Sequence, residues 1–204
     1  MPGRGRFIVF EGGEGSGKST QASLLASVLG AELTREPGGT RLGEMLRPLM
    51  LERAAGPIDP RSELLLMVAA RAQHCAERIV PTLESGRDVV CDRFSGSTIA
   101  YQGFGRGLPV TEVKSACALA TAGLDADLTL LLDVPLMVAS TRRTRPLDAI
   151  ESAGDGFHDR VRAGFLELAR SDPRWVVVSG EGSIADVAAG IQSIVASRLR
   201  ATRS

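Results

Sequence analysis

The segment from Gly12 to Ser19 reads GGEGSGKS and fits the pattern GxxxxGK[ST]. It lies between a short apolar run, Phe7–Phe10, and a stretch of helical pattern, Lys18–Leu29. In such a strand–loop–helix unit, glycine backbone N–H groups surround phosphate oxygens, and the helix N-terminus adds positive potential. We therefore expect a phosphate-binding loop in which the lysine neutralises phosphates and the serine hydroxyl binds Mg²⁺. The residues expected in this loop are Gly12, Gly13, Glu14, Gly15, Ser16, Gly17, Lys18, Ser19 and Thr20.

The rest of the chain alternates short apolar runs with longer helical patterns, which is typical of a parallel sheet built from βα units. The pattern predicts an α/β fold, a five-stranded parallel sheet with helices on both faces. One domain is expected over residues 1–204, with flexible ends at 1–5 and 201–204. Ligands of such sheets bind beyond the carboxyl ends of the strands. The expected strands are Arg6–Glu11, Ala31–Thr34, Asp88–Cys91, Leu128–Asp133 and Trp175–Ser179.

Prolines mark several expected helix boundaries. Pro48 is expected to end a helix over Arg41–Met50. Pro60 is expected to begin a long helix, and Pro81 a separate short one. The other helices are expected over Ser95–Gln102 and Thr111–Ala122, from Pro135 behind a capping Asp133, and over Ser183–Leu199.

Charge and hydropathy exclude several classes of protein. Lys+Arg and Asp+Glu both number 24, so the net charge is zero, whereas binding to nucleic acid or a membrane surface needs excess positive charge. The longest apolar run, Leu64–Ala70, is too short to span a bilayer, and the run that stops at Glu11 is too short for a signal peptide. We therefore expect a cytoplasmic protein that binds neither nucleic acid nor a membrane.

Residue usage narrows the class further. The chain contains no asparagine, which disfavours a GTPase with an Asn-Lys-x-Asp guanine loop. The three cysteines are far apart, no CxxC occurs and only two histidines exist, so reduced buried thiols are expected rather than a zinc site.

Four further segments place arginines, acids and an aromatic near the expected carboxyl ends of strands. Thr34–Thr40 reads TREPGGT, and Asp92-Arg93 follows the third expected strand. Each segment taken alone can be explained without a ligand, as a turn, a solvated helix face or part of the core. Together they have the composition that a second phosphorylated substrate needs. The helical members are Arg47, the face of Glu63, Met67 and Arg71, and the face of Thr98, Tyr101 and Gln102.

These segments closely resemble bacterial thymidylate kinases, which are P-loop nucleoside monophosphate kinases. The resemblance covers about residues 7–199 and implies transfer of the γ-phosphoryl group of ATP to dTMP, with Mg²⁺, by a homodimer. The matching segments, in order, are EGGEGSGKST, TREPGGT, AARAQH at 69–74, DR at 92–93, AYQG at 100–103 and DLTL at 127–130.

The resemblance also implies roles for individual residues. On the donor side, Lys18 would hold phosphates, while Ser19 and Asp92 would hold Mg²⁺. On the acceptor side, Arg47 and Arg93 would bind the phosphate, Arg71 with Thr98 would recognise the thymine edge, and Met67 would pack on the base. Tyr101 would crowd the ribose 2′ position, and Glu14 would face the 3′-OH. Glu36, Pro37 and Gln102 complete the substrate-binding set.

A segment at about 142–156 resembles the LID that closes over ATP in this family. The phosphate loop carries the acid Glu14 and no arginine, so a catalytic arginine is expected from the LID. Arg142 and Arg145 lie at i, i+3 and can face the same way, and Arg142 is the first choice. The chain departs from the family at Met67, where Phe is frequent, at Ala149, where many relatives have Arg, and at Ser179-Gly180-Glu181, where relatives often carry Asp.

Two alternatives stay open at this point. Another nucleoside monophosphate kinase, acting on UMP, CMP or AMP, would differ at Arg71, Thr98 and Tyr101. A P-loop ATP-binding switch without phosphoryl transfer would have Lys18, Asp92 or Arg93 altered, and none is altered.

Overall fold

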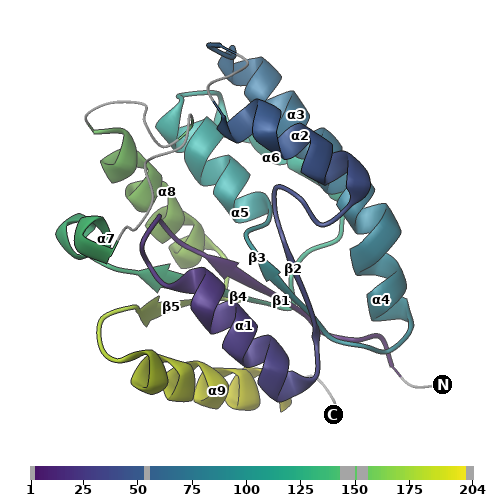
Figure 1. Ribbon diagram of the computed structural model, residues 1–204, viewed down its shortest axis with the longest axis vertical. Coiled ribbons are helices and arrows are strands. Elements are labelled where there is room, and N and C mark those ends of the chain that lie inside the picture. The colour runs from purple at the N-terminus through teal and green to yellow at the C-terminus, as the bar shows by residue number, and fades with distance from the viewer. Residues whose placement is uncertain (1–2, 53–55, 143–149, 151–155, 201–204) are drawn as a thin grey trace.

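Strand β1 (Phe7–Glu11) lies at the centre of a five-stranded sheet and is buried along its whole length. The computed structural model, which describes residues 3–52, 56–142, 150 and 156–200, orders the strands β2-β3-β1-β4-β5, all parallel (Figure 1). A strand with neighbours on both edges and helices on both faces meets no water, so it can be an unbroken apolar run. The expected fold class is confirmed. The other strands are β2 (Glu32–Arg35), β3 (Val89–Asp92), β4 (Leu128–Asp133) and β5 (Trp175–Ser179).

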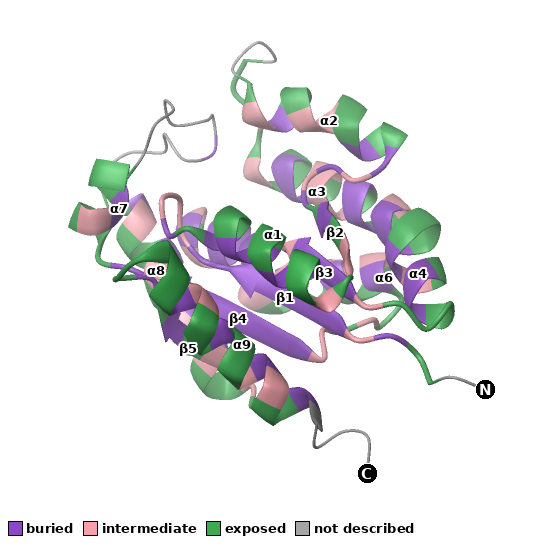
Figure 2. Ribbon diagram, turned by 60° about the horizontal axis from the view of Figure 1, so that its bottom comes forward, coloured by how far each residue is buried: buried purple, intermediate pink, exposed green. Residues whose placement is uncertain are grey.

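Helices cover both faces of the sheet, and the purple strands between them in Figure 2 are buried. On one face, α1 (Lys18–Leu29) and α9 (Ile184–Arg200) pack with Ile8 and Phe10. Phe7 and Val9 point to the opposite face, because successive side chains of a strand alternate. That face is covered by α3 (Pro60–His74), α4 (Val80–Glu84), α5 (Ser95–Thr98), α6 (Val110–Thr121) and α8 (Phe157–Ser171), while α2 (Arg41–Leu51) packs on α3 and α7 (Leu136–Arg142) follows β4.

Strands β2 and β3 each begin and end one residue later than expected. The last pair of their ladder joins Arg35 and Asp92, two polar residues that an apolar pattern excludes. The strand-to-strand hydrogen bonding therefore continues to the polar edge where the acceptor-side segments begin.

Pro48 does not end its helix, although the observed end is within one residue of the expected Met50. Helix α2 continues to Leu51, and the Glu52 N–H donates to the Pro48 carbonyl at 2.9 Å. Proline removes one hydrogen bond from its own turn but leaves its carbonyl able to continue the helix.

The expected break before Pro81 is also wrong. Helix α3 runs through a π-helical turn, Cys75–Ile79, directly into α4. In an α-helix a proline ring clashes with the carbonyl four residues earlier. Here the wider turn, closed by a bond from the Val80 N–H to the Cys75 carbonyl, immediately precedes the proline. A second π-helical segment, Ile99–Gly105, extends α5 beyond the expected end at Gln102.

The chain ends and the expected LID are described only in part. Within the expected flexible N-terminus, Arg4 pairs with Asp127 at 3.1 Å, and the Gly5 N–H donates to the Leu83 carbonyl at 2.8 Å. Residues 201–204 and, apart from Arg142, Ile150 and Gly156, the expected LID lie outside the described residues. Among the described helices, none combines the length and the apolar character needed to cross a membrane.

Candidate active site

The Gly12–Ser19 loop connects the carboxyl end of β1 to α1. Three of its glycines have positive φ, 143° at Gly12, 74° at Gly15 and 89° at Gly17. A Cβ at Gly12 would lie 2.4 Å from the Leu132 carbonyl oxygen, and one at Gly15 would lie 2.3 Å from the Ala139 carbonyl oxygen. Only glycine fits both positions, so the backbone of the loop can wrap closely under a ligand.

Two side chains inside this loop are suited to an anion. The Lys18 side chain is buried, and its Nζ donates to the Gly13 carbonyl at 3.1 Å. The Ser16 hydroxyl is buried and has no hydrogen-bond partner among the residues that the structure describes. A buried polar group without a partner is costly, and a phosphate oxygen would satisfy it.

Ser19 and Asp92 meet at the start of α1. The Ser19 hydroxyl donates to Asp92 Oδ2, and Asp92 Oδ1 is buried without a hydrogen-bond partner in the described part of the chain. Mg²⁺ prefers oxygen ligands, keeps several waters and is usually bound by one or two protein groups plus substrate phosphates. This hydroxyl–carboxylate pair beside the loop therefore fits such an ion.

Arg93 lies between the phosphate loop and the acceptor side. Its Nη1 donates to the Gly12 carbonyl and to the Ser97 hydroxyl, both at 3.0 Å, and its guanidinium lies 5.3 Å from the Tyr101 ring centre. Its backbone has φ 72°, which is uncommon for a residue with a side chain. The guanidinium therefore bridges the two halves of the site.

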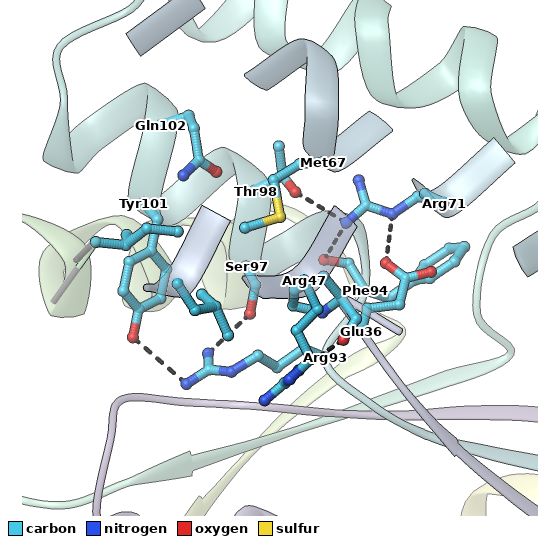
Figure 3. A pocket seen from close by; sticks show the side chains of 13 residues that line it. Glu36, Arg47, Met67, Arg71, Arg93, Phe94, Ser97, Thr98, Tyr101 and Gln102 are labelled. Atoms are coloured by element: carbon cyan, nitrogen blue, oxygen red, sulfur yellow. Dashed lines mark hydrogen bonds and ion pairs between the residues drawn. The ribbon is translucent and has the colours of Figure 1, made fainter. Parts of the chain in front are cut away.

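Next to Arg93 a pocket opens toward α3 and the α5 region (Figure 3). It contains nine of the ten residues that the sequence places on the acceptor side; the tenth, Glu14, lines a neighbouring hollow together with Tyr101 and Arg162. The nine are Glu36, Pro37, Arg47, Met67, Arg71, Arg93, Thr98, Tyr101 and Gln102, and Leu51, Phe94, Ser97 and Ile150 complete the lining.

Arg71 is buried at the back of this pocket with four hydrogen bonds. Its Nε donates to Glu36 Oε2 at 2.7 Å, and its Nη2 donates to the Thr98 hydroxyl at 2.8 Å and the Phe94 carbonyl at 3.1 Å (Figure 3). Its Nη1 contacts Cys117 Sγ at 3.4 Å. Burial is the largest single influence and opposes the charge, but the charge and hydrogen bond of Glu36, together with Cys117 and Glu11, outweigh it, so the pKa of Arg71 is raised. The arginine thus stays charged inside an apolar wall.

Glu36 is fixed in turn from the other side. Its Oε1 contacts His74 Nδ1 at 3.0 Å, and His74 Nε2 contacts the Thr34 hydroxyl at 2.6 Å. The His74 side chain is fully buried. His74 is not among the residues predicted from the sequence, although it lies at i+3 from Arg71 and therefore on the same helix side.

The open side of the pocket carries a second arginine and a thioether. Arg47 Nη1 donates to the Pro37 carbonyl at 2.6 Å, and the Glu36–Pro37 peptide is cis. Met67 is only partly buried and projects between Thr98 and Arg71 in Figure 3. A thioether at this place can pack on a flat ring.

Gln102 is held by an acid behind the pocket. Its Nε2 donates to Glu63 Oε1 at 2.8 Å, and Arg106 pairs with the same carboxylate at 2.9 Å. Glu63 itself does not line the pocket, so of the expected Glu63, Met67 and Arg71 face, only Met67 and Arg71 reach it.

The donor-side arginines are described only in part. Arg142 ends α7, and its Nη1 donates to the Gly180 carbonyl at 2.7 Å. Arg145 lies outside the described residues, as does Ala149. Ile150, within the expected LID, is buried and lines the acceptor pocket. Asp133, expected as a helix cap, pairs with Arg162 through two 2.7 Å bonds, and Arg162 is not among the residues predicted from the sequence.

Comparisons with known proteins agree with this geometry. The family model described as Thymidylate kinase matches residues 10–191. The chain is 47% identical over 199 residues to a thymidylate kinase from Synechococcus sp., with 95% of each covered, and 45% identical over 197 residues to one from Cutibacterium acnes, covering 94% of this chain and 96% of that one. The crystal structure of thymidylate kinase from Ehrlichia chaffeensis is 36% identical and similar with a TM-score of 0.78, covering 95% of this chain and 99% of that chain. The chain therefore belongs to the thymidylate kinase family.

Proposed function

We propose that the chain transfers the γ-phosphoryl group of ATP to dTMP, giving dTDP and ADP, with Mg²⁺. The observation that carries this proposal is the pocket of Figure 3, in which a buried arginine–threonine pair faces an opening bounded by two further arginines beside the phosphate loop. Pyrimidine recognition and phosphate binding then occur at opposite ends of one hollow. Family membership supports the same reaction.

On the donor side, the loop amides and Lys18 would hold the ATP phosphates. When bound, Mg²⁺ neutralises phosphate charge, and Ser19 and Asp92 are the residues that would hold it. Arg142 and Arg145 would come from the LID side; Arg142 already lies at the end of α7, next to the loop that follows β5. Phosphoryl transfer needs positioning and positive charge more than covalent chemistry, and this side supplies both.

On the acceptor side, Arg47 and Arg93 would bind the dTMP phosphate. Arg93 also donates to the Gly12 carbonyl of the phosphate loop, so its guanidinium would stabilise the negative charge that moves from the donor to the acceptor phosphate during transfer. Glu14 would face the sugar 3′-OH, while Glu36, Pro37 and Gln102 would shape the wall.

The base would be recognised by Arg71, Thr98 and Met67. The described partners account for four of the five N–H donors of Arg71, which leaves one Nη1 donor for a base carbonyl. This N–H can donate to a carbonyl oxygen of thymine. It cannot donate to cytosine, whose amino group presents hydrogen instead of oxygen. A mismatch of this kind lowers catalytic efficiency by roughly 10⁴-fold.

We also infer a homodimer. Leu42, Met45 and Leu49 lie at i, i+3 and i+7 on one face of α2 and are exposed, as is Leu65 of the neighbouring α3. Exposed apolar side chains gathered on neighbouring helices indicate a protein contact, and a second copy of the chain is the occupant we propose. Light scattering of the purified protein and of Met45→Glu tests this: a wild-type monomer would refute it.

Turnover with a panel of nucleotides tests the reaction. Purified protein with Mg-ATP should convert dTMP with the highest kcat/KM, and CMP or UMP turned over as efficiently would refute the proposal. The Tyr101 variants test the sugar. Tyr101→Ala should admit the ribose nucleotide UMP, whereas the matched Tyr101→Phe keeps the ring and should still exclude it.

A further inference from the structure

Glu11 is the last residue of β1 and directly precedes the phosphate loop. Its side chain is fully buried, and it does not line the acceptor pocket. None of the roles assigned above uses it. An isolated buried carboxylate is costly, so Glu11 needs hydrogen-bonding or charged partners.

The carboxylate accepts three hydrogen bonds from the turn that carries Arg93. Oε1 accepts from the Phe94 N–H at 3.0 Å and the Ser97 N–H at 2.9 Å, while Oε2 accepts from the Ser97 hydroxyl at 2.5 Å. All three donors lie between the end of β3 and the end of α5. Glu11 therefore ties the central strand to the neighbouring strand's active-site turn.

The Ser97 hydroxyl passes this connection on to Arg93. A hydroxyl has one proton and two lone pairs, and an arginine can only donate. Because Ser97 gives its proton to Glu11, its lone pairs face Arg93 Nη1, which donates to it at 3.0 Å. The same nitrogen donates to the Gly12 carbonyl of the phosphate loop at 3.0 Å.

The backbone of Arg93 needs such support. Its φ of 72° is in the left-handed region, and a non-glycine residue stays there only when its surroundings hold it. Its own N–H is held by the Phe10 carbonyl at 2.9 Å, and the next residue's N–H by Glu11. Two consecutive residues of β1 thus fix the turn.

We propose that Glu11 is a positioning residue for phosphoryl transfer, which holds the Arg93 guanidinium between the phosphate loop and the acceptor through Ser97 and the Phe94 backbone. The proposal rests on the role proposed above for Arg93. Glu11 does not touch substrate. Removing its charge changes where the Arg93 guanidinium lies and how firmly it is held.

The surroundings of Glu11 supply a spectroscopic readout. Burial raises its pKa to about 7, while the Ser97 hydroxyl and the charge of Arg93 act in the opposite direction. Trp175, the single tryptophan, lies beside it: a Cβ on Gly96 would be 2.6 Å from the Trp175 ring and 2.8 Å from Glu11 Oε1. Two further titratable or charged groups interact with Glu11, Cys91 of β3 and Arg71 of α3. Glu11 also lines a cavity whose other charged or titratable residues are Lys114 and Cys117 of α6, Asp125, Asp172 and Arg174.

Three variants test the proposal. Glu11→Gln keeps the shape and removes the charge; Ser97→Ala keeps the charge and the backbone hydrogen bonds but removes the hydroxyl that connects Glu11 to Arg93. Glu32→Gln is the matched control, because it makes the same change at the first residue of β2, at the opposite end of that strand from the edge that carries the site. Steady-state kinetics with dTMP and ATP, and Trp175 fluorescence of the enzyme without substrates, are both measured from about pH 6 to about pH 9.

We expect Glu11→Gln and Ser97→Ala each to lower kcat about tenfold, with KM for ATP changed less than about twofold. Wild-type fluorescence should show a step near pH 7 that Glu11→Gln abolishes. Ser97→Ala should keep the step but move it to higher pH, because the Ser97 hydrogen bond lowers the pKa of Glu11. Glu32→Gln should change neither readout.

Wild-type kcat in both site variants would overturn the proposal, as would a fluorescence step that survives Glu11→Gln. If Glu11→Gln does not fold, the kcat of Ser97→Ala decides alone. Fluorescence needs no turnover. A step that Glu11→Gln abolishes, in a protein inactive toward dTMP, would therefore refute the proposed reaction while leaving the Glu11–Ser97 contact intact.

Discussion

Replacing Arg71 with methionine removes one charge of a buried pair and leaves the other. Only about 2% of the Arg71 side chain and 5% of the Glu36 side chain are exposed, so water cannot compensate Glu36 once its partner is gone. Breaking a buried ion pair by removing one partner costs about 3–5 kcal/mol of unfolding free energy. In a chain of this length, each kcal/mol lowers Tm by about 2–4 °C, so Arg71→Met should lower Tm by about 6–20 °C.

The double variant Glu36→Gln/Arg71→Met separates lost pairing from general damage. With glutamine at position 36, no unpaired charge stays buried. The double variant should therefore be more stable than Arg71→Met by at least about 1.5 kcal/mol, which is a strong coupling for touching residues. Urea unfolding, followed by circular dichroism, measures all four members of the cycle. A loss below about 1 kcal/mol in Arg71→Met, or losses that simply add, would refute the pairing argument.

Four further outcomes are expected. Lys18→Ala should lower kcat by about 10³-fold while leaving the urea midpoint unchanged, since Lys18 lies in a phosphate-cradling loop; near-normal turnover would contradict its role. Met67→Ala should weaken dTMP binding by about 1–2 kcal/mol, seen as a rise in KM for dTMP but not for ATP, and equal rises would indicate damage to α3 instead. Chelating Mg²⁺ should abolish turnover, and Asp92→Asn should raise the Mg²⁺ concentration needed for half-maximal rate; an unchanged requirement would exclude Asp92 as a ligand. The pKa of Glu11 is raised to about 7 from an ordinary value of 4.5, so the unfolding free energy of the wild type, relative to Glu11→Gln, should fall by about 3 kcal/mol as pH rises through that window and stay level above it. Urea midpoints of the two proteins at several pH values measure this, and a constant difference would contradict the burial argument.

The strands were predictable because burial on both faces demands unbroken apolar runs. FIVF in β1 and LLL in β4 are such runs, and the bounds of both strands are within one residue of the prediction. The phosphate loop was equally predictable, since its glycines are required by close approach of Leu132 and Ala139. What periodicity could not show is how helices tolerate proline. Pro48 and Pro81 both lie inside continuous helical structure: α2 continues to Leu51, and a wider turn precedes Pro81.

The ion pair between Glu36 and Arg71 could not be predicted from the sequence pattern. Glu36 and Arg71 are 35 positions apart, and no periodicity connects a turn residue with a helix residue at that distance. Glu11 looked like the end of an apolar run, and its raised pKa depends on burial that only the folded sheet creates. Nine of the ten side chains that the resemblance implies on the acceptor side line one pocket, yet the resemblance did not indicate that His74, Ser97 and Glu11 hold them from behind.

The strand order has a consequence for synthesis of the chain. The central strand β1 is complete after Glu11, but its two neighbours are β3, which ends at Asp92, and β4, which ends at Asp133. During translation, β1 must therefore wait for more than half of the chain before both its edges are paired. Contacts so distant along the chain form slowly, and unpaired apolar strands are prone to aggregation in the meantime. The phosphate loop directly follows β1, so the nascent enzyme gains its nucleotide site only when β1 has paired with both β3 and β4.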